Sequence, residues 1–106
     1  MPELTVVVRA KAKPGREGDL ERELRAIVAS THNEPGCLRY VLHRSIEAAG
    51  TFLTIERWAS KEAIDQHFAM TYVQVLLQKG ADLLAAPPEI SVYELLPEGR
   101  SDKTRI

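Results

Sequence analysis

The amino-acid sequence predicts an α+β domain with the ferredoxin-like βαββαβ arrangement, in which four antiparallel strands form one sheet and helices cover one of its faces. Two observations predict it. Apolar residues alternate with polar ones in four short stretches, and they recur at helical spacing between the first and second and between the third and fourth stretches. A chain of 106 residues supports one core, so we expect one domain over residues 1–96 and a polar C-terminal tail over residues 97–106.

The first half of the chain supplies a strand, a helix and a second strand. Residues 4–12 alternate as a strand does, and a Pro-Gly pair ends them. Behind that turn the spacing predicts a surface helix whose buried stripe consists of Leu20, Leu24, Ile27, Val28 and Thr31. A breaker cluster at residues 32–36 ends the helix, and alternation resumes at residues 37–45 as the second strand.

The third strand runs straight into a helix. Residues 52–58 are rich in β-branched and aromatic side chains, and the short connection at residues 47–50 predicts a hairpin with the second strand. Ser60 is a candidate N-cap for the amphipathic helix that follows and that contains His67.

The second half ends with one more helical segment and one more strand. Residues 70–72 interrupt the helix, a second helical segment follows over residues 73–84, and two prolines stop it. Residues 90–96 alternate as the last strand. The tail from Pro97 is polar and has no periodicity, so we expect it to be loose unless a partner holds it.

The two faces of the predicted sheet differ in their cover. The helix-covered face should carry Leu38, Tyr40, Leu42, Phe52, Thr54, Glu56 and Trp58. The opposite face should carry Thr5, Val7, Val41, Leu53, Ile55 and Leu95. Helices on one side leave this second, apolar face without a cover, and two copies packed sheet to sheet would bury it. The pattern therefore predicts a homodimer.

Short motifs around the third strand resemble a known family. A strand of the form F-x-x-x-E-x-W, a short linker and a helix of the form E-A-x-x-x-H are formed here by Phe52, Glu56, Trp58, Ser60, Glu62, Ala63 and His67. Glu34-Pro35-Gly36-Cys37-Leu38-x-Tyr40 resembles the family's turn into its second strand, and Lys13-Pro14-Gly15 resembles its exit from the first. Over residues 4–95 the chain resembles the antibiotic biosynthesis monooxygenase family.

That resemblance implies a fold and a range of activities. Members are small dimeric α+β barrel proteins that hold a ligand between the sheet and the helices. They include quinol-oxidising monooxygenases without a cofactor, haem-degrading enzymes, an isomerase and many proteins without an established activity. The sequence contains no GxGxxG, Walker or GxSxG motif, which agrees with the cofactor-independent members, and we expect no cofactor.

Two ionisable residues near the only Trp are the candidate catalytic pair. Glu56 on a partly apolar strand would cost several kcal/mol if it were charged and unpaired, and His67 is the nearest candidate partner. Together they could act as a general acid/base couple, with the carboxylate fixing the imidazole tautomer. The alternative is an ion pair that only ties helix to strand. The expected substrate-binding residues are Trp58, Tyr40, Phe52, Thr54, Phe68 and Tyr72.

The remaining His and Cys residues have simpler interpretations. His43 is expected at the surface or in an interface, His32 as a cap on the last carbonyls of the first helix, and Cys37 as a small buried hydrophobe. Three His residues without HxH or HExxH spacing predict no metal site.

Three functions are compatible with these residues. The first is a cofactor-independent monooxygenase that oxidises a small aromatic diol or quinol, with His67 as base and Glu56 orienting it. The second is an isomerase of a small hydroxyketone that uses the same two groups, and the third is a non-enzymatic dimer that binds a small ligand. The sequence does not choose between them, because a fold of this kind does not determine its substrate.

Composition excludes several classes of partner. A formal charge of −1 and a pI near 6.3 provide no basic surface for nucleic acid. No apolar run is long enough for a membrane span, and the N-terminal residues lack the layout of a signal peptide, so we expect a cytoplasmic protein.

Overall fold

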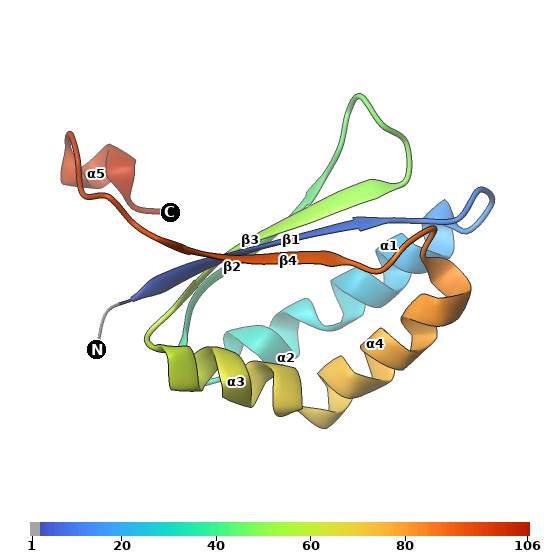
Figure 1. Ribbon diagram of the computed structural model, residues 1–106, viewed down its shortest axis with the longest axis horizontal. Coiled ribbons are helices and arrows are strands. Elements are labelled where there is room, and N and C mark those ends of the chain that lie inside the picture. The colour runs from blue at the N-terminus through green and yellow to red at the C-terminus, as the bar shows by residue number, and fades with distance from the viewer. Residues whose placement is uncertain (1–2) are drawn as a thin grey trace.

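The computed structural model describes residues 3–106 and contains four strands and five helices in that range (Figure 1). In chain order they are β1 (Leu4–Lys11), α1 (Glu17–Ala26), α2 (Val28–His32), β2 (Cys37–Arg44), β3 (Thr51–Trp58), α3 (Lys61–Ala69), α4 (Thr71–Leu83), β4 (Glu89–Glu94) and α5 (Ser101–Thr104).

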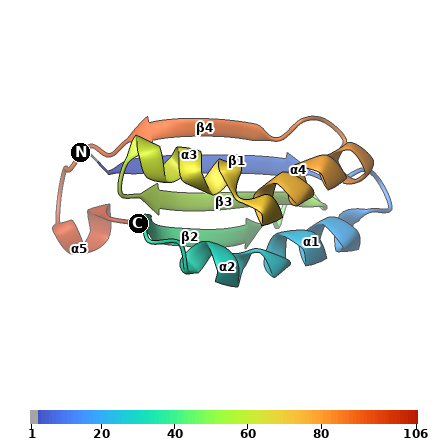
Figure 2. The same ribbon diagram turned by 90° about the horizontal axis from the view of Figure 1, so that it is seen from below.

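The four strands form one antiparallel sheet in the order β2-β3-β1-β4. The central pair is in register from Leu4 opposite Trp58 to Lys11 opposite Thr51. Figures 1 and 2 show α1 to α4 together on one side of the sheet, with α5 apart from them. This is the predicted ferredoxin-like fold.

Two helix boundaries follow from local backbone chemistry. The Ser60 hydroxyl accepts the Ala63 N–H at 3.1 Å, so Ser60 is the predicted N-cap of α3. Met70 is extended, with φ −62° and ψ 138°, and separates α3 from α4. The expected break at residues 70–72 is thus confined to one residue, and α4 begins at Thr71 instead of residue 73.

The predicted first helix is divided in two. α1 ends at Ala26 and α2 begins at Val28. The Thr31 hydroxyl donates to the carbonyl oxygen of Ile27 at 2.8 Å, a bond to the preceding turn that commonly bends helices.

A bulge at the start of β2 changes the face of one residue. Cys37 lies opposite Trp58 and Arg39 opposite Arg57, so Leu38 has no partner of its own in the ladder. Leu38 is 36% exposed, whereas Cys37 packs against the core. The prediction that Leu38 belongs to the covered face was therefore wrong, while Tyr40 lies opposite Glu56 on that face as expected.

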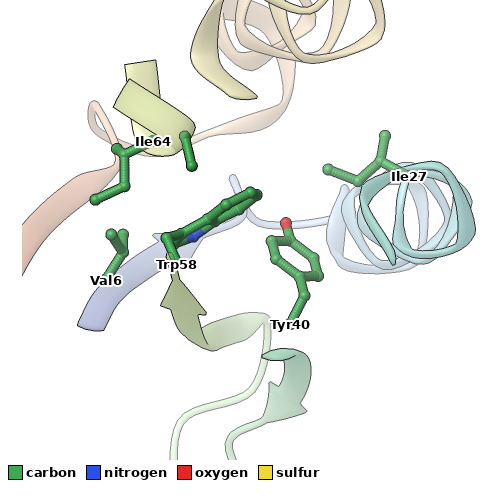
Figure 3. Packing of buried hydrophobic residues seen from close by; sticks show 6 residues of the cluster. Val6, Ile27, Tyr40, Trp58 and Ile64 are labelled. Carbon is green, nitrogen blue, oxygen red and sulfur yellow. The ribbon is translucent and has the colours of Figure 1, made fainter. Parts of the chain in front are cut away.

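The core on the covered face has two parts. One cluster consists of Val6, Ile27, Tyr40, Trp58, Ala63 and Ile64. Figure 3 shows Trp58 between Val6 and Ile64 on one side and Tyr40 on the other. The second cluster consists of Ala10, Ala12, Leu20, Phe52 and Leu83.

The end of the chain differs from the expectation in two details. β4 ends at Glu94, two residues before the predicted end of the last strand, so Leu95 lies beyond the ladder. The tail contains one short helical turn, Ser101–Thr104, where no structure was expected.

Candidate functional site

A cavity of about 480 Å³ lies between the covered face of the sheet and the helices, within the size range of small-ligand sites. Its polar lining groups come from four residues, Tyr40, Thr54, Glu56 and His67. The rest of its wall is apolar or backbone, and no Arg or Lys is among the lining residues that the structure describes.

Glu56 is held from both sides by its neighbours on β3. The period-two alternation of the strand places Thr54, Glu56 and Trp58 on the same face. The Thr54 hydroxyl donates to Oε2 at 2.6 Å and the Trp58 indole N–H donates to Oε1 at 2.8 Å. Glu56 is only 1% exposed, and this burial raises the pKa of its carboxyl, although the two hydrogen bonds and nearby His67 oppose the shift.

His67 lies in a cage of aromatic rings. Its imidazole centroid is 4.7 Å from that of Trp58, 5.2 Å from Phe68 and 5.8 Å from Tyr40, and only 3% of the residue is exposed. Rings on several sides leave the imidazole little freedom to rotate.

The hydrogen-bond partner of His67 is Glu34. Nδ1 of His67 lies 2.8 Å from Oε2 of Glu34, and both side chains are buried. A carboxylate only accepts hydrogen bonds, so in the neutral imidazole the proton is on Nδ1 and Nε2 is the free base. Nε2 has no hydrogen-bond partner among residues 3–106. The expectation that Glu56 orients His67 is thus corrected, since no hydrogen bond joins these two side chains in the described structure.

Glu34 also accepts a hydrogen bond from Tyr72. The Tyr72 hydroxyl donates to the same Oε2 that His67 contacts. Burial, followed by this contact with Glu34, raises the pKa of Tyr72 to about 12. Glu34 is 7% exposed, so its carboxylate is compensated by these two donors instead of water.

A glycine brings Glu34 to His67. A Cβ at Gly36 would lie 2.3 Å from the Cβ of Ala63, so only glycine lets the turn before β2 pack directly on α3. The Ala59 N–H also donates to the Gly36 carbonyl at 2.9 Å. His67 follows Ala63 by one helical turn, which places it beside the residues of this turn.

In the sequence, Glu34 is recognisable only as part of a turn. The signal that could have found it is an acidic residue two positions before a glycine in a turn that packs against the helix of His67, but that packing is tertiary and has no local pattern.

Five of the eight predicted site residues line the cavity. They are His67, Glu56, Tyr40, Thr54 and Phe68. Trp58 and Tyr72 do not line it. Trp58 donates a hydrogen bond to the carboxyl group of Glu56, and Tyr72 donates one to that of Glu34. Phe52 belongs to the second core cluster and lines a wide depression between α1, α2 and β2.

The other candidates lie outside the cavity. His32 does not cap its helix; its Nε2 lies 2.9 Å from the Tyr40 carbonyl oxygen and ties α2 to β2. His43 is exposed on the uncovered face, as expected. Cys37 is half-buried, and burial raises the pKa of its thiol to about 11.

Within residues 3–106 no three His, Cys, Asp or Glu side chains are grouped as metal ligands. None of the helices in that range is both long and apolar enough to cross a membrane.

Fold and site together define a class: a ferredoxin-like domain whose sheet and helices enclose a ligand-sized cavity with buried acid/base groups. A family model described as "Antibiotic biosynthesis monooxygenase" matches residues 3–79, and the chain belongs to that family.

Individual relatives are similar to this chain over most of its length. The chain is 28% identical over 85 residues to a Bacillus subtilis protein named "Putative monooxygenase YcnE", covering 80% of this chain and 90% of that one. It is 29% identical over 92 residues to an uncharacterised Synechocystis protein, covering 87% of this chain and 63% of the relative. The crystal structure of PA3566 from Pseudomonas aeruginosa has a TM-score of 0.85 and 32% identity, and the match covers 91% of this chain and 96% of that one.

Proposed function

We propose that the protein is a monooxygenase that oxidises a small aromatic diol or quinol, with His67 as the general base. The observation that carries this is the hydrogen bond between His67 Nδ1 and the buried Glu34, which leaves Nε2 as the free base of a residue that lines the cavity. Membership in a family described as monooxygenases supports the reaction type.

The electrostatics of the cavity favour a neutral substrate. Glu56 and Glu34 are two buried carboxyls near one imidazole, and no Arg or Lys of the described residues lines the wall. A substrate with a carboxylate or phosphate would meet no cation there. A phenolic hydroxyl enters without charge and gains its negative charge only when His67 takes the proton.

The reaction balances without a further reductant. A dihydroxybenzene and dioxygen give a hydroxyquinone and water: one oxygen atom is inserted into a ring C–H bond, and the other leaves as water with the two hydrogens that the diol loses. The ring supplies all four electrons. His67 removes the phenolic proton first, because the phenolate is the form rich enough in electrons to react with dioxygen.

Glu56 is the second acid/base group of this proposal. It lines the same cavity as His67, and its raised pKa lets it exchange a proton closer to neutral pH than an exposed glutamate can. Tyr40, Thr54 and Phe68 contact the substrate ring as lining residues, and Trp58 acts through Glu56 and His67.

One observation favours a second candidate. Two acid/base groups on one cavity are also what an isomerase needs to move a proton between the carbons of a hydroxyketone. Oxygen uptake separates the two reactions, since isomerisation consumes none.

We also propose that the protein is a homodimer. The support is the uncovered sheet face, where Val7, Leu53 and Ile55 lie on neighbouring strands with Val41, and no helix of the described chain lies over them. Two such faces packed together would exclude water from this apolar area.

The test is oxygen consumption by the purified protein with a panel of hydroquinones and catechols, followed by mass spectrometry of the product made under ¹⁸O₂. One labelled atom per product molecule is the expected result. Uptake no greater than that of the buffer, together with turnover of hydroxyketones, would move the isomerase ahead. Tight binding without turnover of either class would favour the binding protein.

A further inference from the structure

The cavity is far larger than one aromatic ring. A cavity of about 150 Å³ is enough to hold benzene. The volume of about 480 Å³ between sheet and helices is therefore roughly three times what the ring of a dihydroxybenzene needs.

The extra volume lies along one face of α4. The lining residues of this helix and its C-terminal end are Val73, Leu76, Leu77, Gly80, Ala81, Leu83 and Leu84. Apart from Leu83, they recur at helical spacing, and the span from Val73 to Leu84 corresponds to about 16 Å at 1.5 Å per residue. His67 and Phe68 lie just before the start of this helix, so the acid/base groups are at one end of the row.

The wall along that row is apolar. Across from α4 it consists of Val8, Ala10, Leu20 and Leu24, and beyond the helix of Ala85, Ala86 and two prolines. Small residues, among them Ala10, Gly80 and Ala81, leave the space open.

Part of the cavity wall next to the edge strand β4 is exposed to solvent. Leu77 on α4 and Ile90 on β4 both line the cavity and are 42% and 44% exposed. Apolar side chains in water at the mouth of a cavity are stabilised when an apolar group covers them.

We propose that the ligand is a phenol or quinol that carries a hydrocarbon chain, with its hydroxyl at His67 and Glu56 and its chain along α4, past Leu77 toward Ala81 and Leu84. This inference rests on the proposed function for the hydroxylated ring and adds the class of substituent. The polar lining residues would meet the hydroxylated ring, and the apolar residues along α4 would meet the hydrocarbon chain.

The experiment measures binding of phenol, 4-ethylphenol, 4-butylphenol and 4-hexylphenol by titration calorimetry. Each methylene that enters the row along α4 should lower Kd by about two- to fourfold. The hexyl compound should then bind at least about 50-fold more tightly than phenol. A Kd that does not change with chain length would overturn the inference.

A blocking variant shows where the chain binds. Ala81→Phe places a ring in the row from an exposed helix position, where folding tolerates a large side chain. It should leave the Kd of phenol within about threefold and abolish the gain from longer chains. Ala85→Phe, in the exposed loop that lines the same part, should do likewise.

The matched control is Ala29→Phe, an exposed alanine on α2 that does not line the cavity, and its series should equal that of the wild type. An undiminished chain-length effect in both blocking variants would place the chains elsewhere and refute the proposal.

Failure of this inference and failure of the proposed function give different results. If unsubstituted hydroquinone supports oxygen uptake but Kd does not change along the alkylphenol series, the proposed function stands and the hydrocarbon substituent is refuted. A chain-length effect without oxygen uptake from alkylhydroquinones would refute the function and retain the ligand class.

Discussion

Replacing Glu34 by Gln tests which carboxylate positions the catalytic imidazole. The carboxamide keeps one oxygen for the Tyr72 hydroxyl, so the fold should persist, but it removes the charge that His67 Nδ1–H faces at 2.8 Å. In the alternative orientation of the amide, the NH₂ group takes the place of Oε2 and donates to Nδ1, with the Tyr72 hydroxyl as a second acceptor; this places the ring proton on Nε2, the nitrogen that must be free to act as a base.

The expected loss follows from one hydrogen bond to a charged acceptor. Such a bond contributes about 1.5–3 kcal/mol, which corresponds to a rate about 10- to 150-fold lower. Glu34→Ala is a poorer test, because it leaves the buried Nδ1–H of His67 without a partner, at a cost of about 1–3 kcal/mol, in a domain whose total stability is about 5–15 kcal/mol.

The assay has two parts, and one needs no substrate. ¹⁵N NMR of the imidazoles distinguishes protonated from unprotonated ring nitrogens, and the protein has only three His residues. We expect Nδ1–H in the wild type and a shift toward Nε2–H in Glu34→Gln. Glu56→Gln should keep the wild-type tautomer. If instead Glu56→Gln changes the tautomer and lowers the rate while Glu34→Gln does neither, the pairing seen here does not position His67.

Three further outcomes are expected. His67→Ala should lower quinol-dependent oxygen uptake by about 100-fold or more. His67→Asn should do the same, although its amide can still donate to Glu34. Full activity in a folded His67→Asn protein would show that His67 only ties the helix to its surroundings. Burial raises the pKa of Glu56 above 4.5, so ionising its carboxyl costs more free energy in the folded state. The free energy of unfolding of the wild type should therefore fall relative to that of Glu56→Gln as the pH rises through the folded pKa, by at most about 1.4 kcal/mol per pH unit. A difference that stays constant between pH 4 and 9 would contradict this. Ile55→Lys should give monomer or aggregate, because it buries an unpaired charge in the proposed dimer interface, and sedimentation that finds the wild type monomeric at micromolar concentration would refute the dimer.

The strands and most helix ends were predictable because their signals are local. Alternation in residues 52–58 predicted that Thr54, Glu56 and Trp58 lie on one face, and Ser60, as an N-cap residue, indicated the start of α3. The bulge at Leu38 was not predictable from alternation, since an inserted residue keeps the chain extended and only changes its face.

The site was predictable only in part. His67, Glu56 and the cavity side of β3 follow from periodicity and from the resemblance, but the pairing of His67 does not. It depends on Glu34, 33 residues away, which reaches the imidazole because Gly36 lets a turn contact Ala63. The two residues are too far apart in the sequence for a local pattern to reveal this contact, and the short connection from the third strand to the following helix suggested Glu56 instead.

The contact between Trp58 and His67 couples the fluorescence of the protein to the charge of His67. The chain has a single Trp, and its ring centroid lies 4.7 Å from that of the imidazole. A protonated imidazole quenches indole emission, whereas the neutral ring quenches it much less. Fluorescence of the unlabelled protein should thus report the charge of His67 before any substrate is known. A ligand that exchanges a proton with His67 when it binds should change the intensity of the Trp58 emission.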